Sequence, residues 1–172
     1  NVSDELKEWG LYNIGSYWIY KDSITGIFDS VFVESVVSSH WRRNKGDSII
    51  LEEQIKVKLG SNKGFSSYTL DSHGGIIGEN NAVVFNLDTV IPQYSQIKAN
   101  VNLAYLNVLG NNYTQVRYLY VFEQSSAHSS AYIVTEKNYM KKNVGIIKRI
   151  ANQNITGGFN QNLELVRYNV LQ

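Results

Sequence analysis

The sequence has 172 residues, of which 43% are hydrophobic and 18% charged, and its sixteen basic and fifteen acidic side chains leave a formal charge of +1. A chain of this length forms one domain, residues 1–172, with a core that needs no disulfides, and its balanced charge provides no field to attract nucleic acid or an anionic membrane. The absence of cysteine excludes thiolate chemistry, but it fits a cytosolic protein and a bacterial envelope protein alike.

The N-terminal segment predicts a short helix. Residues 2–9 carry several charges, Leu6 and Trp9 are three positions apart, and Gly10 is a residue that ends helices. We expect the apolar side of this helix to pack on the strands that follow.

Residues 15–22 and 27–37 predict a β-hairpin, because both stretches are rich in aromatic and β-branched residues and a polar turn at 23–26 separates them. Trp18 has two interpretations within it. The side chain either fills the end of a barrel or lines a ligand pocket, and the structural role is the commoner one for a large aromatic residue.

Residues 48–59 give the clearest alternation in the chain. One face carries Ile49, Leu51, Ile55, Val57 and Leu59, and the other carries Glu52, Gln54, Lys56 and Lys58. This pattern predicts an antiparallel strand with one buried and one wet face. Glu53 is the exception, because it points to the apolar face, where a carboxylate is most often at a strand end or paired with a basic partner and less often contacts a ligand.

Further strands are predicted at residues 65–70, 76–87 (with a break at 79–81), 97–109, 113–123, 131–137, 144–150 and 163–171, with Pro92 in a loop or at an edge. The strand at 113–123 is apolar on both faces, so we expect it to be central. The whole pattern predicts an all-β fold, an antiparallel meander of about eight to ten strands with a short N-terminal helix. Accumulated twist and exposed edges favour curling of such a sheet into a barrel or half-barrel.

Gly145 interrupts a run of β-branched residues. A glycine at such a place predicts a bulge, a bend or the close approach of another side chain. We expect an aromatic residue such as Trp18 or Tyr168 to cover it, which would make the N- and C-terminal strands neighbours.

The sequence gives no sign of catalytic or metal-binding machinery. His40, His73 and His128 are far apart and have no partner at a metal-ligand spacing, so we expect loop histidines. Asp71, Ser72 and His73 are consecutive neighbours in a turn, and catalytic triads are assembled from separate elements. We therefore expect no enzyme, no metal and no cofactor.

Two short basic clusters remain, Trp41-Arg42-Arg43 and Lys141-Lys142. An exposed tryptophan beside two arginines could stack on a sugar or a base, but two or three residues do not make a nucleic-acid footprint. The twelve tyrosines on a weakly charged chain suit a binding face for carbohydrate, lipid or protein, and they also suit cross-strand pairs in a sheet.

The stretch NIGSYWIYKDS at residues 13–23, followed by DSV at 29–31, resembles the N-terminal signature of small, mostly uncharacterised lipoproteins of Gram-negative cell envelopes. The later stretches GNNYTQV (110–116), YMKKNVGIIK (139–148) and LELVRY (163–168) are similar to the closing pattern of that group. The resemblance implies an all-β extracytoplasmic domain, in the periplasm or at the outer membrane, behind a lipid-anchored cysteine. It implies no catalytic residues.

Three functions stay open at this point. The first is a non-enzymatic envelope module that binds an apolar ligand, a glycan or a protein partner, with membrane contact only through the lipid anchor. The second is a structural or assembly domain with a filled interior. The third is a lipocalin-like carrier, although the spacing from Gly15 to Trp18 is one residue longer than the Gly-x-Trp that opens lipocalins and turns the tryptophan to the other face.

Overall fold

The structure is a computed structural model that describes residues 1–61, 65, 67–72, 75–78, 83–86, 97–124, 132–151 and 161–171. These residues form one helix and eleven strands. The elements are α1 (Asp4–Gly10), β1 (Tyr17–Asp22), β2 (Phe28–Lys45), β3 (Ser48–Gly60), β4 (Tyr68–Asp71), β5 (Gly75–Gly78), β6 (Val83–Asn86), β7 (Ile97–Val108), β8 (Asn111–Gln124), β9 (Tyr132–Lys141), β10 (Gly145–Ala151) and β11 (Gln161–Asn169).

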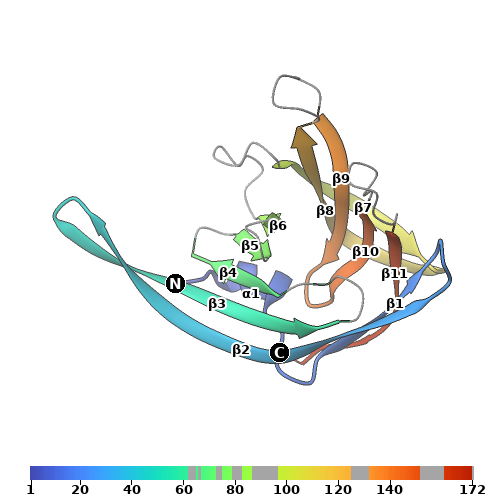
Figure 1. Cartoon of the computed structure of the whole chain (residues 1–172), viewed down its shortest axis with the longest axis horizontal. Coiled ribbons are helices and arrows are strands. Elements are labelled where there is room, and N and C mark those ends of the chain that lie inside the picture. The colour runs from blue at the N-terminus through green and yellow to red at the C-terminus, as the bar shows by residue number, and fades with distance from the viewer. Residues whose placement is uncertain are drawn as a thin grey trace.

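All the strands belong to one antiparallel sheet in the order β6-β5-β4-β3-β2-β1-β11-β10-β9-β8-β7. Every neighbouring pair is consecutive in the chain except β1 and β11, which join the two ends of the meander in the middle of the sheet. The sheet curls until β6 comes near β7 and β8, with no ladder between them in the described part of the chain (Figure 1). The predicted all-β meander, its curled half-barrel form and the pairing of the first and last strands are confirmed.

Helix α1 lies inside the curl and touches both halves of the sheet. Ser3 caps its N-terminus by accepting a hydrogen bond from Leu6 N, as expected of an N-cap serine. On one side Val2 N donates to Glu53 on β3, and Tyr68 on β4 donates to Gly10 O. On the other side Asn143 N, in the β9–β10 turn, donates to the carbonyl of Glu8. The predicted helix and its packing on the strands are confirmed.

The core lies between α1 and the concave face of the sheet, and its most completely buried side chains include Leu6, Val57, Leu70, Ile147 and Leu165. Trp18 belongs to this core. Its Nε1 donates to Val144 O at 2.5 Å, and its ring meets the Tyr12 ring edge-on. The structural interpretation of Trp18 is therefore confirmed.

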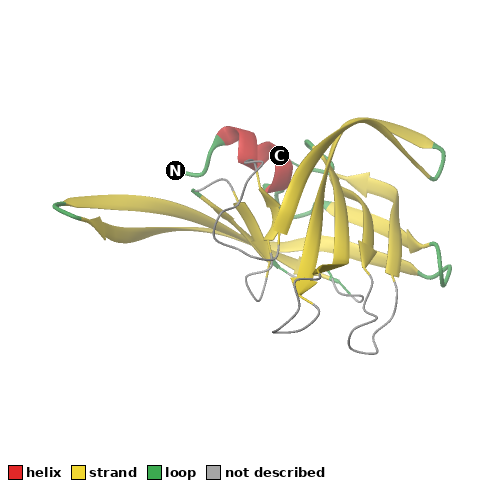
Figure 2. Ribbon diagram, turned by 90° about the horizontal axis from the view of Figure 1, so that it is seen from above, coloured by secondary structure: helices red, strands yellow, loops and turns green. Residues whose placement is uncertain are grey.

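The longest hairpin, β2–β3, extends beyond the rest of the sheet as an arm (Figures 1 and 2). The prediction ended the first of these strands at residue 37, but β2 continues to Lys45 and turns at Gly46. The predicted buried face of β3 is correct for Ile55 and Val57 and wrong for Ile49 and Leu51, which are 66% and 58% exposed. These two residues lie on the arm, beyond the reach of the core.

Of two other predictions, one is wrong and one is confirmed. The strand predicted to be central, now β8, lies one strand from the end of the sheet. Gly145 has a left-handed backbone with φ +96°, and a Cβ built there would meet Tyr12 and Trp18, so the predicted close approach is confirmed. Pro92 and residues 87–96 lie outside the described residues.

Candidate ligand-binding site

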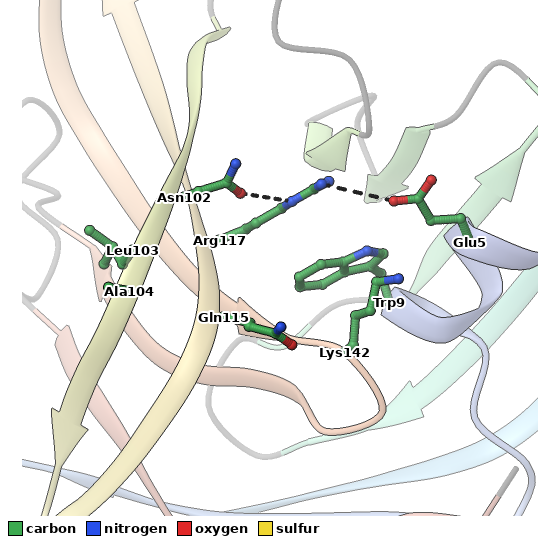
Figure 3. Close-up of a pocket in the computed structure, with 8 residues that line it drawn as sticks. All are labelled: Glu5, Trp9, Asn102, Leu103, Ala104, Gln115, Arg117 and Lys142. Atoms are coloured by element: carbon green, nitrogen blue, oxygen red, sulfur yellow. Dashed lines mark hydrogen bonds and ion pairs between the residues drawn. The ribbon is translucent and has the colours of Figure 1, made fainter.

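A pocket of about 400 Å³ lies between α1, the β7–β8 hairpin and the β9–β10 turn. Figure 3 shows side chains from all three regions converging on it. Its lining residues are Glu5, Trp9, Asn102, Leu103, Ala104, Gln115, Arg117 and Lys142. Two cations, a carboxylate, two amides and an indole thus face a volume within the usual range of small-ligand sites.

Arg117 projects from β8 toward α1 (Figure 3). Its Nε donates to Asn102 Oδ1 at 3.0 Å, across the β7–β8 pair in which the two residues are directly opposite. Its Nη2 is 3.9 Å from Glu5 Oε1, a long ion pair. Its Nη1 is buried and has no hydrogen-bond partner among the described residues. A guanidinium group with donors to spare is suited to bind a carboxylate or a phosphate.

Both cations of the pocket, Arg117 and Lys142, lie over the ring of Trp9. The Arg117 Cζ lies 5.1 Å from the ring centre, and the Lys142 Nζ lies 6.0 Å from it, both within cation–π range. Lys142 also pairs with Glu8 at 2.6 Å, so its charge is more fully neutralised than that of Arg117.

Tyr12 anchors the backbone of Trp9. The Tyr12 hydroxyl donates to Trp9 O at 2.7 Å. Burial raises the pKa of Tyr12 far above its ordinary value, so the hydroxyl keeps its proton and remains a donor. The hydrogen bond therefore satisfies the Trp9 carbonyl, one of those that the last turn of the helix leaves without an intrahelical partner.

The backbone beside the pocket has unusual conformations. Gln115, a lining residue, has φ +54°, and Asn143, next to Lys142, has φ +59°. Asparagine adopts this left-handed region readily, whereas glutamine rarely does. Backbone held in such a conformation is concentrated at functional sites, where the surrounding structure fixes side chains in place.

The structure separates most of the residues singled out from the sequence. Lys142 lines the pocket, whereas Lys141 donates to Thr114 O nearby. Trp41, Arg42 and Arg43 are exposed on the β2–β3 arm. His40 is exposed on the same arm, and His73 and His128 lie outside the described residues. The described members of these groups are divided between the pocket region and the β2–β3 arm.

Glu53 has a structural role that sequence reasoning missed. It lies within β3 and not at a strand end, and it accepts hydrogen bonds from Val2 N and Ser38 Oγ. The hydrogen bond from Val2 lowers the pKa of Glu53 below its ordinary value against the opposing effect of burial, with help from Lys7, Ser38 and His40. The carboxylate thus ties the N-terminal segment to the sheet.

Arg117, Trp9 and Gln115 were not predicted as site residues. One signal in the sequence could have identified Arg117, since it is a charged residue inside the apolar stretch 113–123 that becomes β8. A buried charge requires a partner, and such a charge in a strand marks a candidate site. The convergence with Trp9 requires the curl of the sheet, which places α1 opposite β8.

Within the described ranges, no three His, Cys, Asp or Glu side chains are grouped so as to hold a metal ion. In the same part of the chain, no helix is long and apolar enough to cross a bilayer. No family model, no curated protein and no solved structure matches the chain.

Proposed function

We propose that the protein is a non-enzymatic binding domain whose pocket at α1 holds a small ligand through a carboxylate or phosphate group. The observation that carries this proposal is that Arg117 lines a pocket of about 400 Å³ and that its buried Nη1 has no hydrogen-bond partner among the described residues. An anionic oxygen at that place would accept from Nη1 and compensate for the desolvation of the guanidinium.

The rest of the wall combines polar groups with the apolar surface of Leu103, Ala104 and the Trp9 ring. Asn102 and Gln115 offer amide groups, and the Trp9 ring is already faced by two cations. The apolar interior of the half-barrel is occupied by Leu6 and Trp9 of α1 together with core side chains of the sheet. A lipocalin-like carrier would need that interior for its apolar ligand. We therefore favour binding at the pocket over transport of an apolar ligand inside the half-barrel.

We also propose an extracytoplasmic envelope location with a lipid anchor, which depends only on the resemblance carried by residues 13–23, 29–31, 110–116, 139–148 and 163–168. Fractionation of cells that express the full-length protein tests it. Recovery of the protein in the cytosol would contradict it.

The ligand proposal is tested by native mass spectrometry of the freshly purified protein and by NMR titration with acetate and with inorganic phosphate. We expect a copurified mass, or shifts of the Trp9 indole and Arg117 side-chain signals that saturate. Arg117→Met removes the guanidinium while keeping an unbranched apolar stem. We expect it to weaken binding roughly 10- to 100-fold, the loss of one or two charge-assisted hydrogen bonds.

The matched control is Arg42→Met, which removes an exposed arginine on the β2–β3 arm. Arg42 is not among the residues that line the pocket. It should bind like the wild type. Equal weakening in the two variants would mean that only general charge attracts the anion. A bare wild-type chain with no shifts on titration would contradict the proposal and favour the structural or assembly domain.

A further inference from the structure

The β2–β3 arm leaves one edge of β2 without a partner strand. β1 pairs with β2 only from Phe28 to Phe32, and Val33 N donates to Ser16 O just beyond the end of that ladder. From Ser35 to Lys45, beyond a bulge at Glu34, β2 pairs with β3 on one side and, in the part of the chain that the structure describes, with no strand on the other. This open edge is longer than most whole strands.

The middle of the open edge, Val36–Trp41, lacks the usual protection against pairing, and it is flanked by a bulge at Glu34 and by Arg42 and Arg43. Natural edge strands are commonly short, carry lysine or proline, or bulge outward. Here the segment Val36-Val-Ser-Ser-His-Trp41 contains no proline, lysine or carboxylate. Val37 and Trp41 are 58% and 60% exposed. They lie on the same face of the strand, four residues apart and opposite Lys56 and Glu52 of β3.

The geometry points to a second copy of this chain as the partner of the edge. We propose that two β2 edges pair antiparallel about a two-fold axis through Ser39. The axis is perpendicular to the sheet, so facing residues must come from the same face of β2. With the axis at Ser39, Val37 of each copy faces Trp41 of the other, and Ser38 faces His40.

Neighbouring registers are less favourable. An axis at Ser38 places Trp41 opposite Ser35, and an axis at His40 places Val37 opposite Arg43. Only the Ser39 register brings both exposed apolar residues into cross-strand pairs, the kind of aromatic and β-branched contact that stabilises sheets. In this register the paired segment runs from Ser35 to Arg43 and ends just before Val33, where Ser16 already occupies the edge. The dimer would continue the sheet of one copy into that of the other.

The register is tested with a single cysteine, because the chain contains none. Facing residues of an antiparallel pair have Cα atoms about 4.5 to 5.5 Å apart, within the range that a disulfide spans. Under mild oxidation Ser39→Cys is therefore expected to give a disulfide-linked dimer. The matched control is Ser30→Cys, also exposed on β2 but beside β1, and it should remain a monomer.

The interface is tested by sedimentation of the wild type, Trp41→Lys and Val37→Lys. Both positions are exposed, so the variants should fold normally, and circular dichroism checks this. We expect a wild-type dimer and at least a tenfold weaker dimer in each variant. A wild-type monomer throughout the micromolar range would overturn the proposal, and so would equal cross-linking of Ser39→Cys and Ser30→Cys. Faster cross-linking of Ser38→Cys than of Ser39→Cys would overturn the register.

Discussion

At the scale of single residues, Gly145 shows how backbone conformation and packing act together. Its φ of +96° lies in a region that L side chains rarely adopt, and an added Cβ would lie 3.2 Å from Tyr12 Oη and 3.4 Å from Trp18 Nε1. Gly110 has a similar φ of +85° but open space around it. The two glycines therefore separate the cost of the backbone angle from the cost of the contact.

We expect Gly110→Val to cost about 1–2 kcal/mol, since it meets only the left-handed backbone penalty. Gly145→Val should cost roughly 1–3 kcal/mol more, because it also overpacks against Tyr12 and Trp18. Urea denaturation measures both. Equal losses would show that the ring contacts at Gly145 have no energetic weight.

The contact with Trp18 is isolated by a double-mutant cycle. Trp18→Ala removes the ring, so Gly145→Val should cost less in that background than in the wild type, whereas Gly110→Val should cost the same in both. Additive losses for the Gly145 pair would refute the contact. The Trp18 indole also donates to Val144 O, so the single Trp18 variant is destabilised in its own right.

At the scale of elements, strand β3 shows that an alternating pattern of apolar and polar residues predicts which side chains share a face but not whether that face is buried. The period of two correctly placed Ile55 and Val57 on one face and Lys56 on the other. It could not reveal that Ile49 and Leu51, on the same face, have nothing to pack against. A sequence pattern defines a face, whereas burial depends on what the rest of the chain places over that face.

This distinction predicts unequal effects of aspartate substitutions along one face of β3. Val57→Asp places an unpaired charge in the core and should unfold the protein or cost about 3 kcal/mol or more. Leu51→Asp lies on the arm and should change stability by only about 0.5 kcal/mol, as should Lys56→Asp on the opposite face. The denaturation midpoints of the three variants measure these differences in stability. If Leu51→Asp were as costly as Val57→Asp, the arm would be packed in solution.

The candidate site was less accessible to sequence reasoning than the fold. The strands, the helix and the neighbourhood of Trp18 and Gly145 follow from local patterns and from the need of a long sheet to curl. The pocket joins Trp9, Arg117 and Lys142, which are distant in sequence and share no motif. Their meeting depends on the degree of curl and on the position of α1, and neither leaves a periodic signal in the chain.

At the scale of the whole molecule, the antiparallel pairing of β1 with β11, here called the seam, holds together the beginning and the end of the chain. Asp22 lies at one end of this seam. Its carboxylate accepts hydrogen bonds from Ile24 N at 3.0 Å, from Thr25 Oγ1 at 2.9 Å and from Asn162 N at 3.4 Å. Burial alone would raise the pKa of Asp22, but these hydrogen bonds outweigh it and lower the pKa below its ordinary value.

The lowered pKa gives the seam a pH dependence with a defined sign. A carboxyl group whose pKa is lower in the folded protein than in the unfolded chain binds its proton more readily when unfolded. Its stabilising effect is fully present above the unfolded pKa of about 4 and is lost as the pH falls through the folded value. We therefore expect Asp22→Asn to cost about 1–3 kcal/mol at neutral pH, because the amide nitrogen cannot accept from Thr25.

The difference in unfolding free energy between the wild type and Asp22→Asn should shrink as the pH falls below about 4, because the wild-type carboxyl group then carries a proton and resembles the amide. Urea titrations at a series of pH values measure it. Asp47→Asn, exposed in the β2–β3 turn, is the control, and its difference from the wild type should stay small throughout. A difference for Asp22→Asn that grew on acidification would reverse the sign and contradict the view that the charged carboxylate holds the two ends of the chain together.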